Sequence, residues 1–84
     1  MRIYERNLGE RQMIIVLNFS SSHFEHYRFN VSKNDGHFVE LLNTDDYKYN
    51  GYGFVNNYDM KIENNQIGIR LQSFSAVVLE YVKE

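Results

Sequence analysis

The sequence predicts an all-β fold, a small antiparallel Greek-key β-sandwich of about seven or eight short strands that spans residues 1–84. Three observations predict this class. Apolar and polar residues alternate over short stretches, turn residues separate these stretches at short intervals, and no stretch repeats its apolar positions at helical spacing. A chain of 84 residues has room for one hydrophobic core, and therefore for one domain.

Turn residues fix where the predicted strands end. Asn7–Glu10 and Asn64-Asn65 each separate two patterned stretches and are predicted to close hairpins, because Gly and Asn accept positive φ. Asp35-Gly36 is predicted to close another hairpin for the same reason. Only Thr44–Asn57 is long and irregular. The predicted strands are Ile3–Arg6, Gln12–Ser20, Tyr27–Ser32, His37–Asn43, Met60–Glu63, Gln66–Leu71 and Ala76–Val82.

Two of these strands contain runs that are apolar on both faces. Met13–Leu17 and Ala76–Leu79, which continues to Tyr81-Val82, lack the alternation seen in Tyr27–Val31, where every second residue is polar. Such runs are typical of strands that are covered on both sides. We therefore expect these two strands at the centre of a sheet, with cover on each face.

Composition and charge exclude several classes of function. With nine Lys and Arg against eleven Asp and Glu, the net charge of −2 gives no basic excess for a nucleic-acid partner. No apolar run is long enough to cross a bilayer, so we expect no membrane partner. The chain has no Cys and its first residues lack an apolar signal core, which predicts a cytoplasmic location.

No motif for catalysis, a metal or a cofactor emerges from the polar residues. His23, His26 and His37 lack the fourth ligand and the spacing of a zinc site, and no serine lies in a nucleophile elbow. Asp45 and Asp46 do not fit a calcium loop, and adjacent carboxylates cannot easily flank a glycosidic bond. We expect an Asx-type turn there, and no catalytic or cofactor-binding residue in this chain.

Aromatic residues gather in the irregular segment and form the candidate contact site. Such rings can stack on a sugar, dock onto another protein domain, or fold down as a lid over an open end of the sandwich. The first two uses need exposed rings, whereas the third needs buried ones. The sequence leaves these three alternatives open for Tyr47, Tyr49, Tyr52, Phe54 and Tyr58.

Several segments resemble one known family in its order along the chain. Met13–Ser20 is similar to the hydrophobic, Leu-Asn-Phe-Ser strand of the C-terminal all-β domain of the α-amylase superfamily, and of bacterial 1,4-α-glucan (glycogen) branching enzymes in particular. The other matching segments are Tyr27–Val31, Glu40–Asp45, Tyr49–Gly53 with Val55-Asn56, and Ile67–Glu80. The family's usual prolines before the last strand are absent, so a neighbouring amylase-type glucan enzyme is an alternative.

The resemblance implies an accessory role without chemistry. Domains of this kind follow a catalytic (β/α) barrel, which carries all the catalytic residues, so the chain alone should be inactive on glucans. It implies packing on that barrel, and in some members contact with α-glucan, so the alternative function is an α-glucan-binding module. A free domain that exposes its barrel-facing patch should self-associate. The candidate barrel-facing residues are Ile14, Val16, Val77 and Leu79.

Overall fold

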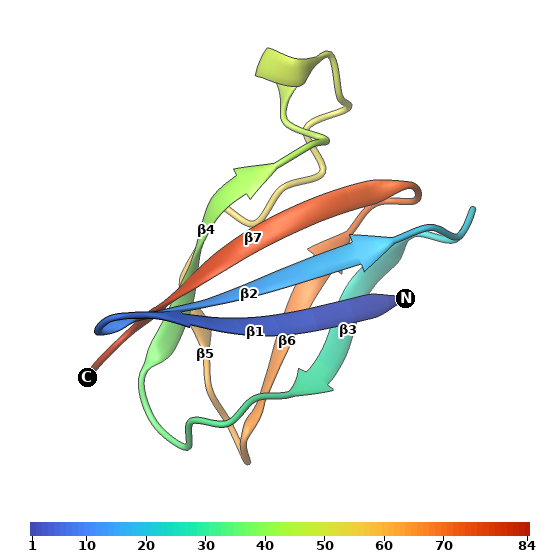
Figure 1. Ribbon diagram of the computed structural model, residues 1–84. Coiled ribbons are helices and arrows are strands. Elements are labelled where there is room, and N and C mark those ends of the chain that lie inside the picture. Colours follow the sequence, from blue (N-terminus) through green and yellow to red (C-terminus); the bar gives the residue numbers. More distant parts are fainter.

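The computed structural model describes all 84 residues and confirms the predicted fold class, with seven antiparallel strands in two sheets (Figure 1). The larger sheet has the order β1-β2-β7-β4-β5, and the smaller sheet pairs β3 with β6. The one helical element is the 3-10 turn η1, and no helix is long and apolar enough to span a membrane. The elements are β1 Arg2–Leu8, β2 Arg11–Asn18, β3 Phe24–Asn30, β4 His37–Asn43, η1 Tyr47–Tyr49, β5 Met60–Lys61, β6 Gln66–Leu71 and β7 Ser75–Val82.

Two of the predicted turns are confirmed. β1 and β2 pair out to Leu8 and Arg11, and Gly9 between them has a φ of 63°. Asn64 and Asn65, with φ values of 54° and 60°, form a two-residue turn closed by the bridge between Glu63 and Gln66. Two successive positive φ values match the right-handed twist of paired strands, which explains why Asn occupies both positions.

The hairpin predicted at Asp35-Gly36 is wrong, because β3 and β4 belong to different sheets. Val31 is buried and its backbone N–H donates to the carbonyl of Asn65, so the chain crosses between the sheets here instead of turning back. Gly36 does have a φ of 91°, and close packing is a second reason for glycine at this position. A Cβ on Gly36 would lie 2.7 Å from the carbonyl oxygen of Val82.

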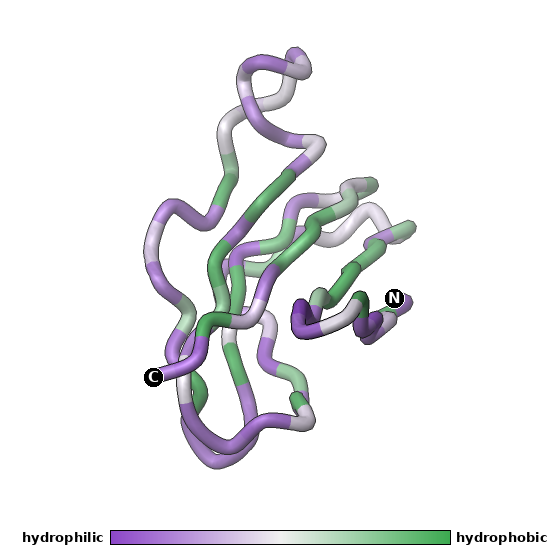
Figure 2. Tube along the Cα trace, turned by 60° about the vertical axis from the view of Figure 1, so that its left-hand side comes forward, coloured by the Kyte–Doolittle hydropathy of each residue, from purple (hydrophilic) through white to green (hydrophobic).

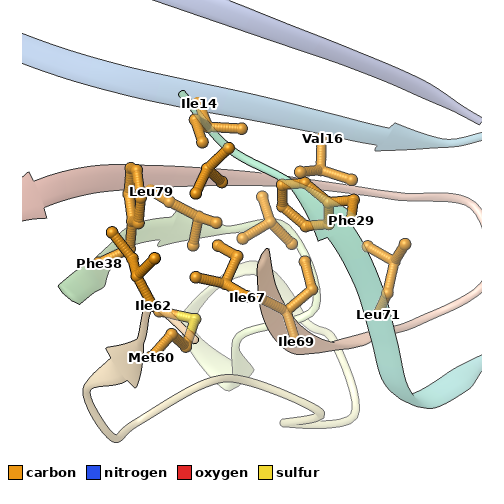
Figure 3. Close-up of a cluster of buried hydrophobic side chains, with 12 residues drawn as sticks. Ile14, Val16, Phe29, Phe38, Met60, Ile62, Ile67, Ile69, Leu71 and Leu79 are labelled. Atoms are coloured by element: carbon orange, nitrogen blue, oxygen red, sulfur yellow. The ribbon is translucent and has the colours of Figure 1, made fainter. Parts of the chain in front are cut away.

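The core fills the space between the two sheets (Figure 3). It includes Ile14, Val16, Val77 and Leu79, each with none of its surface exposed. These four pair across β2 and β7, as Ile14 with Leu79 and Val16 with Val77, and all point inward. The other buried apolar residues are Phe29, Val31, Phe38, Met60, Ile62, Ile67, Ile69 and Leu71.

This placement corrects the predicted barrel-facing set. Ile14, Val16, Val77 and Leu79 were expected on the face away from the core, and they are the centre of the core instead. A run that is apolar on both faces gives no signal for which residues point inward, and a shift of one residue exchanges the faces. The central position predicted for the two strands is confirmed, because β2 and β7 are neighbours inside the five-stranded sheet.

Three almost fully buried asparagines tie the loops to the strands. The amide nitrogen of Asn18 donates to the carbonyls of Ser22 and Gln72, at 2.9 and 3.0 Å. Asn56 similarly joins the long loop to Glu40 of β4 and to the backbone of Arg70. Buried amides of this kind are costly to replace, because their partners would lose hydrogen bonds out of reach of water. The three are Asn18, Asn43 and Asn56, with 1%, 2% and 3% of their surface exposed.

Candidate interaction surfaces

The outer face of the five-stranded sheet carries an apolar surface that no element of this chain covers. Side chains alternate along each strand, so the neighbours of the core residues point outward. In the register, Ile15 lies opposite Val78, and Leu17 lies opposite Ala76. Figure 2 shows that apolar residues are concentrated along the extended stretches of the chain, while the projecting loop is mainly hydrophilic. We call outer face the set Met13, Ile15, Leu17, Val39, Leu41, Leu42, Ala76 and Val78.

A register shift in β4 adds to this surface. The pairing of β4 with β7 is irregular between Glu40 and Leu42, and both Leu41 and Leu42 are exposed. Glu40 remains turned toward the long loop, where it accepts hydrogen bonds from Asn43 and Asn56. The bulge therefore separates a structural carboxylate from two leucines that are free to meet a partner.

A charged pair lies within one end of the outer face, because the register places Glu80 between Met13 and Val39. Glu80 lies opposite Met13 in the register and pairs with Arg11 at the start of β2. The hydrogen bond from Arg11 holds the pKa of Glu80 below its ordinary value, and the same bond raises the pKa of Arg11. On the other side of β2, Arg2, Tyr4 and Arg6 of β1 lie opposite Leu17, Ile15 and Met13, so charged and aromatic side chains flank the apolar residues. Apolar residues flanked by polar ones are common in protein–protein contact surfaces.

The segment 44–58 is here called the tyrosine loop, and its tip around η1 projects from the sandwich (Figure 1). Tyr47 and Tyr52 have 75% and 82% of their surface exposed, and Tyr49 and Tyr58 have 50% and 46%. These four rings do not cover an open end of the sandwich, which excludes the lid for them. They are instead available for contact with a ligand or another domain.

Phe54 differs from the four tyrosines, because its ring packs onto the smaller sheet. The guanidinium carbon of Arg70 lies 4.4 Å from the ring centroid, and His23 meets the ring edge-on at 5.8 Å between centroids. Phe54 is half-buried and anchors the loop against β6. Of the five predicted contact residues, the four tyrosines are each exposed, and Phe54 packs against Arg70 and His23.

Asp45 organises the tyrosine loop from the inside. Its carboxylate is buried and accepts hydrogen bonds from the backbone N–H groups of Tyr52 at 3.3 Å and Phe54 at 2.9 Å. The Asx-type turn predicted for Asp45 and Asp46 is formed by Asp46 alone, and the side chain of Asn43 forms a second one by accepting from the N–H of Asp45. Asp46 similarly accepts from the N–H of Lys48 and caps η1. The role of Asp45 as the centre of the loop was not predicted.

Gly51 allows the loop to pass over Asp45, and Gly51→Ala is expected to open the loop. A Cβ at this position would overlap the backbone carbonyl of Asp45, and backbone cannot move aside as a side chain can. Because Lys48 is exposed beside it, trypsin should then cleave after Lys48 faster, on the order of tenfold.

The matched control is Gly9→Ala, where a Cβ meets nothing within 4 Å. Its positive φ should cost about 1–2 kcal/mol of stability, without faster cleavage at Lys48. Equal cleavage of wild type and Gly51→Ala would show that the loop does not depend on the close approach to Asp45.

The three histidines lie in separate surroundings. His23 packs on Phe54, the ring of His26 lies across Gly68, and Nε2 of His37 is 3.6 Å from a carboxylate oxygen of Asp59. No group of three or more metal-ligating side chains gathers anywhere in the structure. The candidate interaction sites of this domain are therefore its two exposed surfaces, the outer face and the tyrosine loop.

Comparison with known protein families identifies the domain type. Residues 1–82 match the family described as "Alpha amylase, C-terminal all-beta domain", which covers nearly the whole chain. A search of curated proteins finds no match. Domains of this family are non-catalytic accessory parts of α-amylase family enzymes. The chain therefore belongs to the family of α-amylase C-terminal all-beta domains.

Proposed function

We propose that this domain packs its outer face on the catalytic (β/α) barrel of an amylase-family enzyme and stabilises that barrel without taking part in the chemistry. The observation that carries this proposal is the uncovered apolar face centred on Ile15 and Val78. These side chains are half-buried by their neighbours, and burial of the rest against a partner would stabilise the complex at about 25 cal/mol per Å².

The enzyme that fits best is 1,4-α-glucan branching enzyme, which acts in glycogen biosynthesis, and we propose a cytoplasmic location for it. Support comes from the Leu-Asn-Phe-Ser end of the second strand and the ordered segments that follow it. Because the barrel holds the catalytic groups, the isolated chain should not turn over glucans. An uncovered outer face should also make the free domain self-associate.

A binding experiment with two catalytic barrels tests the proposal. The probes are the barrels of the branching enzyme and of an α-amylase from the source organism, each titrated with residues 1–84 in a calorimeter. We expect saturable binding to the branching-enzyme barrel. Ile15→Glu should weaken it at least about tenfold, because a carboxylate would be buried in the contact.

Asn30→Glu is the matched control, because it introduces the same charge on an exposed residue of β3 in the other sheet. This variant should bind like wild type. Binding to the α-amylase barrel alone would remove the branching-enzyme assignment. Docking through the outer face would be contradicted if neither barrel binds the domain. It would also be contradicted if Ile15→Glu and Asn30→Glu weaken binding to the same extent.

A second candidate function is α-glucan binding by the tyrosine loop. The observation that favours it is that each of the four tyrosines is exposed, since an aromatic face can stack on the apolar face of a glucose ring. Titration with maltoheptaose should then change tyrosine fluorescence saturably. Tyr52→Ser should abolish the fluorescence change, whereas the control Tyr4→Ser, on β1, should retain it. If wild type shows no fluorescence change, the tyrosine loop does not bind α-glucan.

A further inference from the structure

The largest cavity of the domain has a volume of about 560 Å³ and lies where the β1–β2 hairpin, the crossover after β3 and the end of β7 meet. Figure 1 shows the hairpin turn and the C-terminus at this same end of the molecule. Gln12 and Tyr81 line the cavity and alternate in phase with the core residues of their strands, so it opens on the core side of the sheet. No residue of the lining belongs to the outer face or to the tyrosine loop.

Gln12 lies at the bottom of this cavity, because it is the one buried residue of the lining, with 6% of its surface exposed. Its amide nitrogen donates to a carboxylate oxygen of Glu5 at 3.1 Å and to the hydroxyl of Ser32 at 2.9 Å. Its amide oxygen is the only buried side-chain polar atom of the chain without a hydrogen-bond partner. Because buried polar groups are nearly always paired, this oxygen indicates a ligand that carries a hydrogen-bond donor.

The walls of the cavity are positively charged, although the chain has a net charge of −2. Three cationic side chains and one carboxylate line it, and these are Arg11, Lys33, Lys83 and Glu10. Arg11 is paired with Glu80, whereas Lys33 and Lys83 make no salt bridge. Nζ of Lys33 lies 5.2 Å from the centroid of the Tyr81 ring, which holds this ammonium group beside the cavity. The two lysines are therefore the cations that are available to an anion.

We propose that this cavity binds a small phosphate ester that also carries hydroxyl groups, such as a hexose phosphate. The phosphate group lies between Lys33 and Lys83, because ammonium groups bind phosphate strongly, and a hydroxyl donates to Oε1 of Gln12. The terminal torsion of a glutamine side chain is soft, so the amide can turn this oxygen toward the ligand. The volume is that of a small-molecule site, and a lining with one aromatic ring among polar side chains suits a hydrophilic ligand. This function does not depend on docking to a catalytic barrel.

Titration of the isotope-labelled free chain, followed by nuclear magnetic resonance, tests the ligand class. The probes are glucose 6-phosphate, inorganic phosphate and glucose. We expect saturable backbone shifts at Gly9, Lys33 and Lys83 with glucose 6-phosphate, and clearly weaker binding of the other two, because each offers only part of the contacts. The side-chain carbonyl carbon of Gln12 should move downfield with glucose 6-phosphate and not with inorganic phosphate, since a carbonyl that accepts a hydrogen bond is deshielded. Equal affinity for inorganic phosphate or for glucose, or no binding of glucose 6-phosphate, would overturn the assignment.

Three variants test the residues that hold the ligand. Lys83→Gln removes an exposed ammonium group and should weaken binding of glucose 6-phosphate about fivefold or more. Lys48→Gln is the matched control, because Lys48 is an exposed lysine of the tyrosine loop, and it should bind like wild type. Gln12→Met should remove the preference for glucose 6-phosphate over inorganic phosphate. If Gln12→Met does not fold, the carbonyl shift in wild type and the affinity of Lys83→Gln decide. Wild-type affinity in Lys83→Gln, or an equal loss in Lys48→Gln, would overturn the proposal and leave docking through the outer face untouched.

Discussion

Val77→Asp is expected to unfold the domain, whereas Val78→Asp is expected to leave it folded. Val77 has none of its surface exposed and pairs with Val16 in the centre of the core. Burial of an unpaired carboxylate there costs several kcal/mol, about as much as the whole stability of a small domain. Val78 points to the outer face, where a carboxylate keeps contact with water.

The two variants form a matched pair, with the same residue replaced by the same charge at adjacent positions. Far-ultraviolet circular dichroism and thermal unfolding at neutral pH distinguish them. Val78→Asp should also self-associate less than wild type in light scattering, because it places a charge in the outer face. Similar Tm values for the two variants, or the reverse order, would contradict the assignment of inner and outer faces.

Asn56→Asp is expected to cost about 3–5 kcal/mol, although it changes only one amide nitrogen to oxygen. The amide nitrogen of Asn56 lies 3.0 Å from a carboxylate oxygen of Glu40 and 3.0 Å from the carbonyl of Arg70. The substitution turns two hydrogen bonds into repulsion between a buried carboxylate and these two acceptors. Urea unfolding followed by circular dichroism should show a lower midpoint with an unchanged slope.

Asn57→Asp provides the control, since Asn57 is exposed beside it and makes no hydrogen bond through its side chain. Its stability should lie within about 0.5 kcal/mol of wild type, as for most surface substitutions. A small effect at Asn56 as well would show that the long loop contributes little to the cooperative unit.

Local signals predicted the strands better than their pairing. Asn64-Asn65 and Gly9 act through their own φ angles, so the turns they form were predictable. Asp35-Gly36 carries the same signal, but the packing of Gly36 against Tyr81 and of Val31 in the core decides the course of the chain. Such contacts join residues far apart in sequence, which propensity does not report.

The candidate site was predicted in part. The tyrosine loop stands out by composition, but the exposure of Tyr52 and the anchoring of Phe54 by Arg70 depend on the fold. The prediction assigned the inward and outward faces of β2 the wrong way round, because Ile14 and Ile15 are the same residue type and give no signal for which one is buried. Buried asparagines such as Asn18 resemble surface residues in sequence, and only their partners show that they are structural.

The central claim is that the outer face of the five-stranded sheet is the surface covered by a catalytic barrel. Hydroxyl-radical footprinting with mass spectrometry tests it directly, on residues 1–84 alone and joined behind the branching-enzyme barrel. We predict that Met13, Leu17 and Leu42 become protected from oxidation in the joined chain, while Tyr52 remains as reactive as in the free domain. Unchanged oxidation at Met13, Leu17 and Leu42, with protection of Tyr52 instead, would contradict the account.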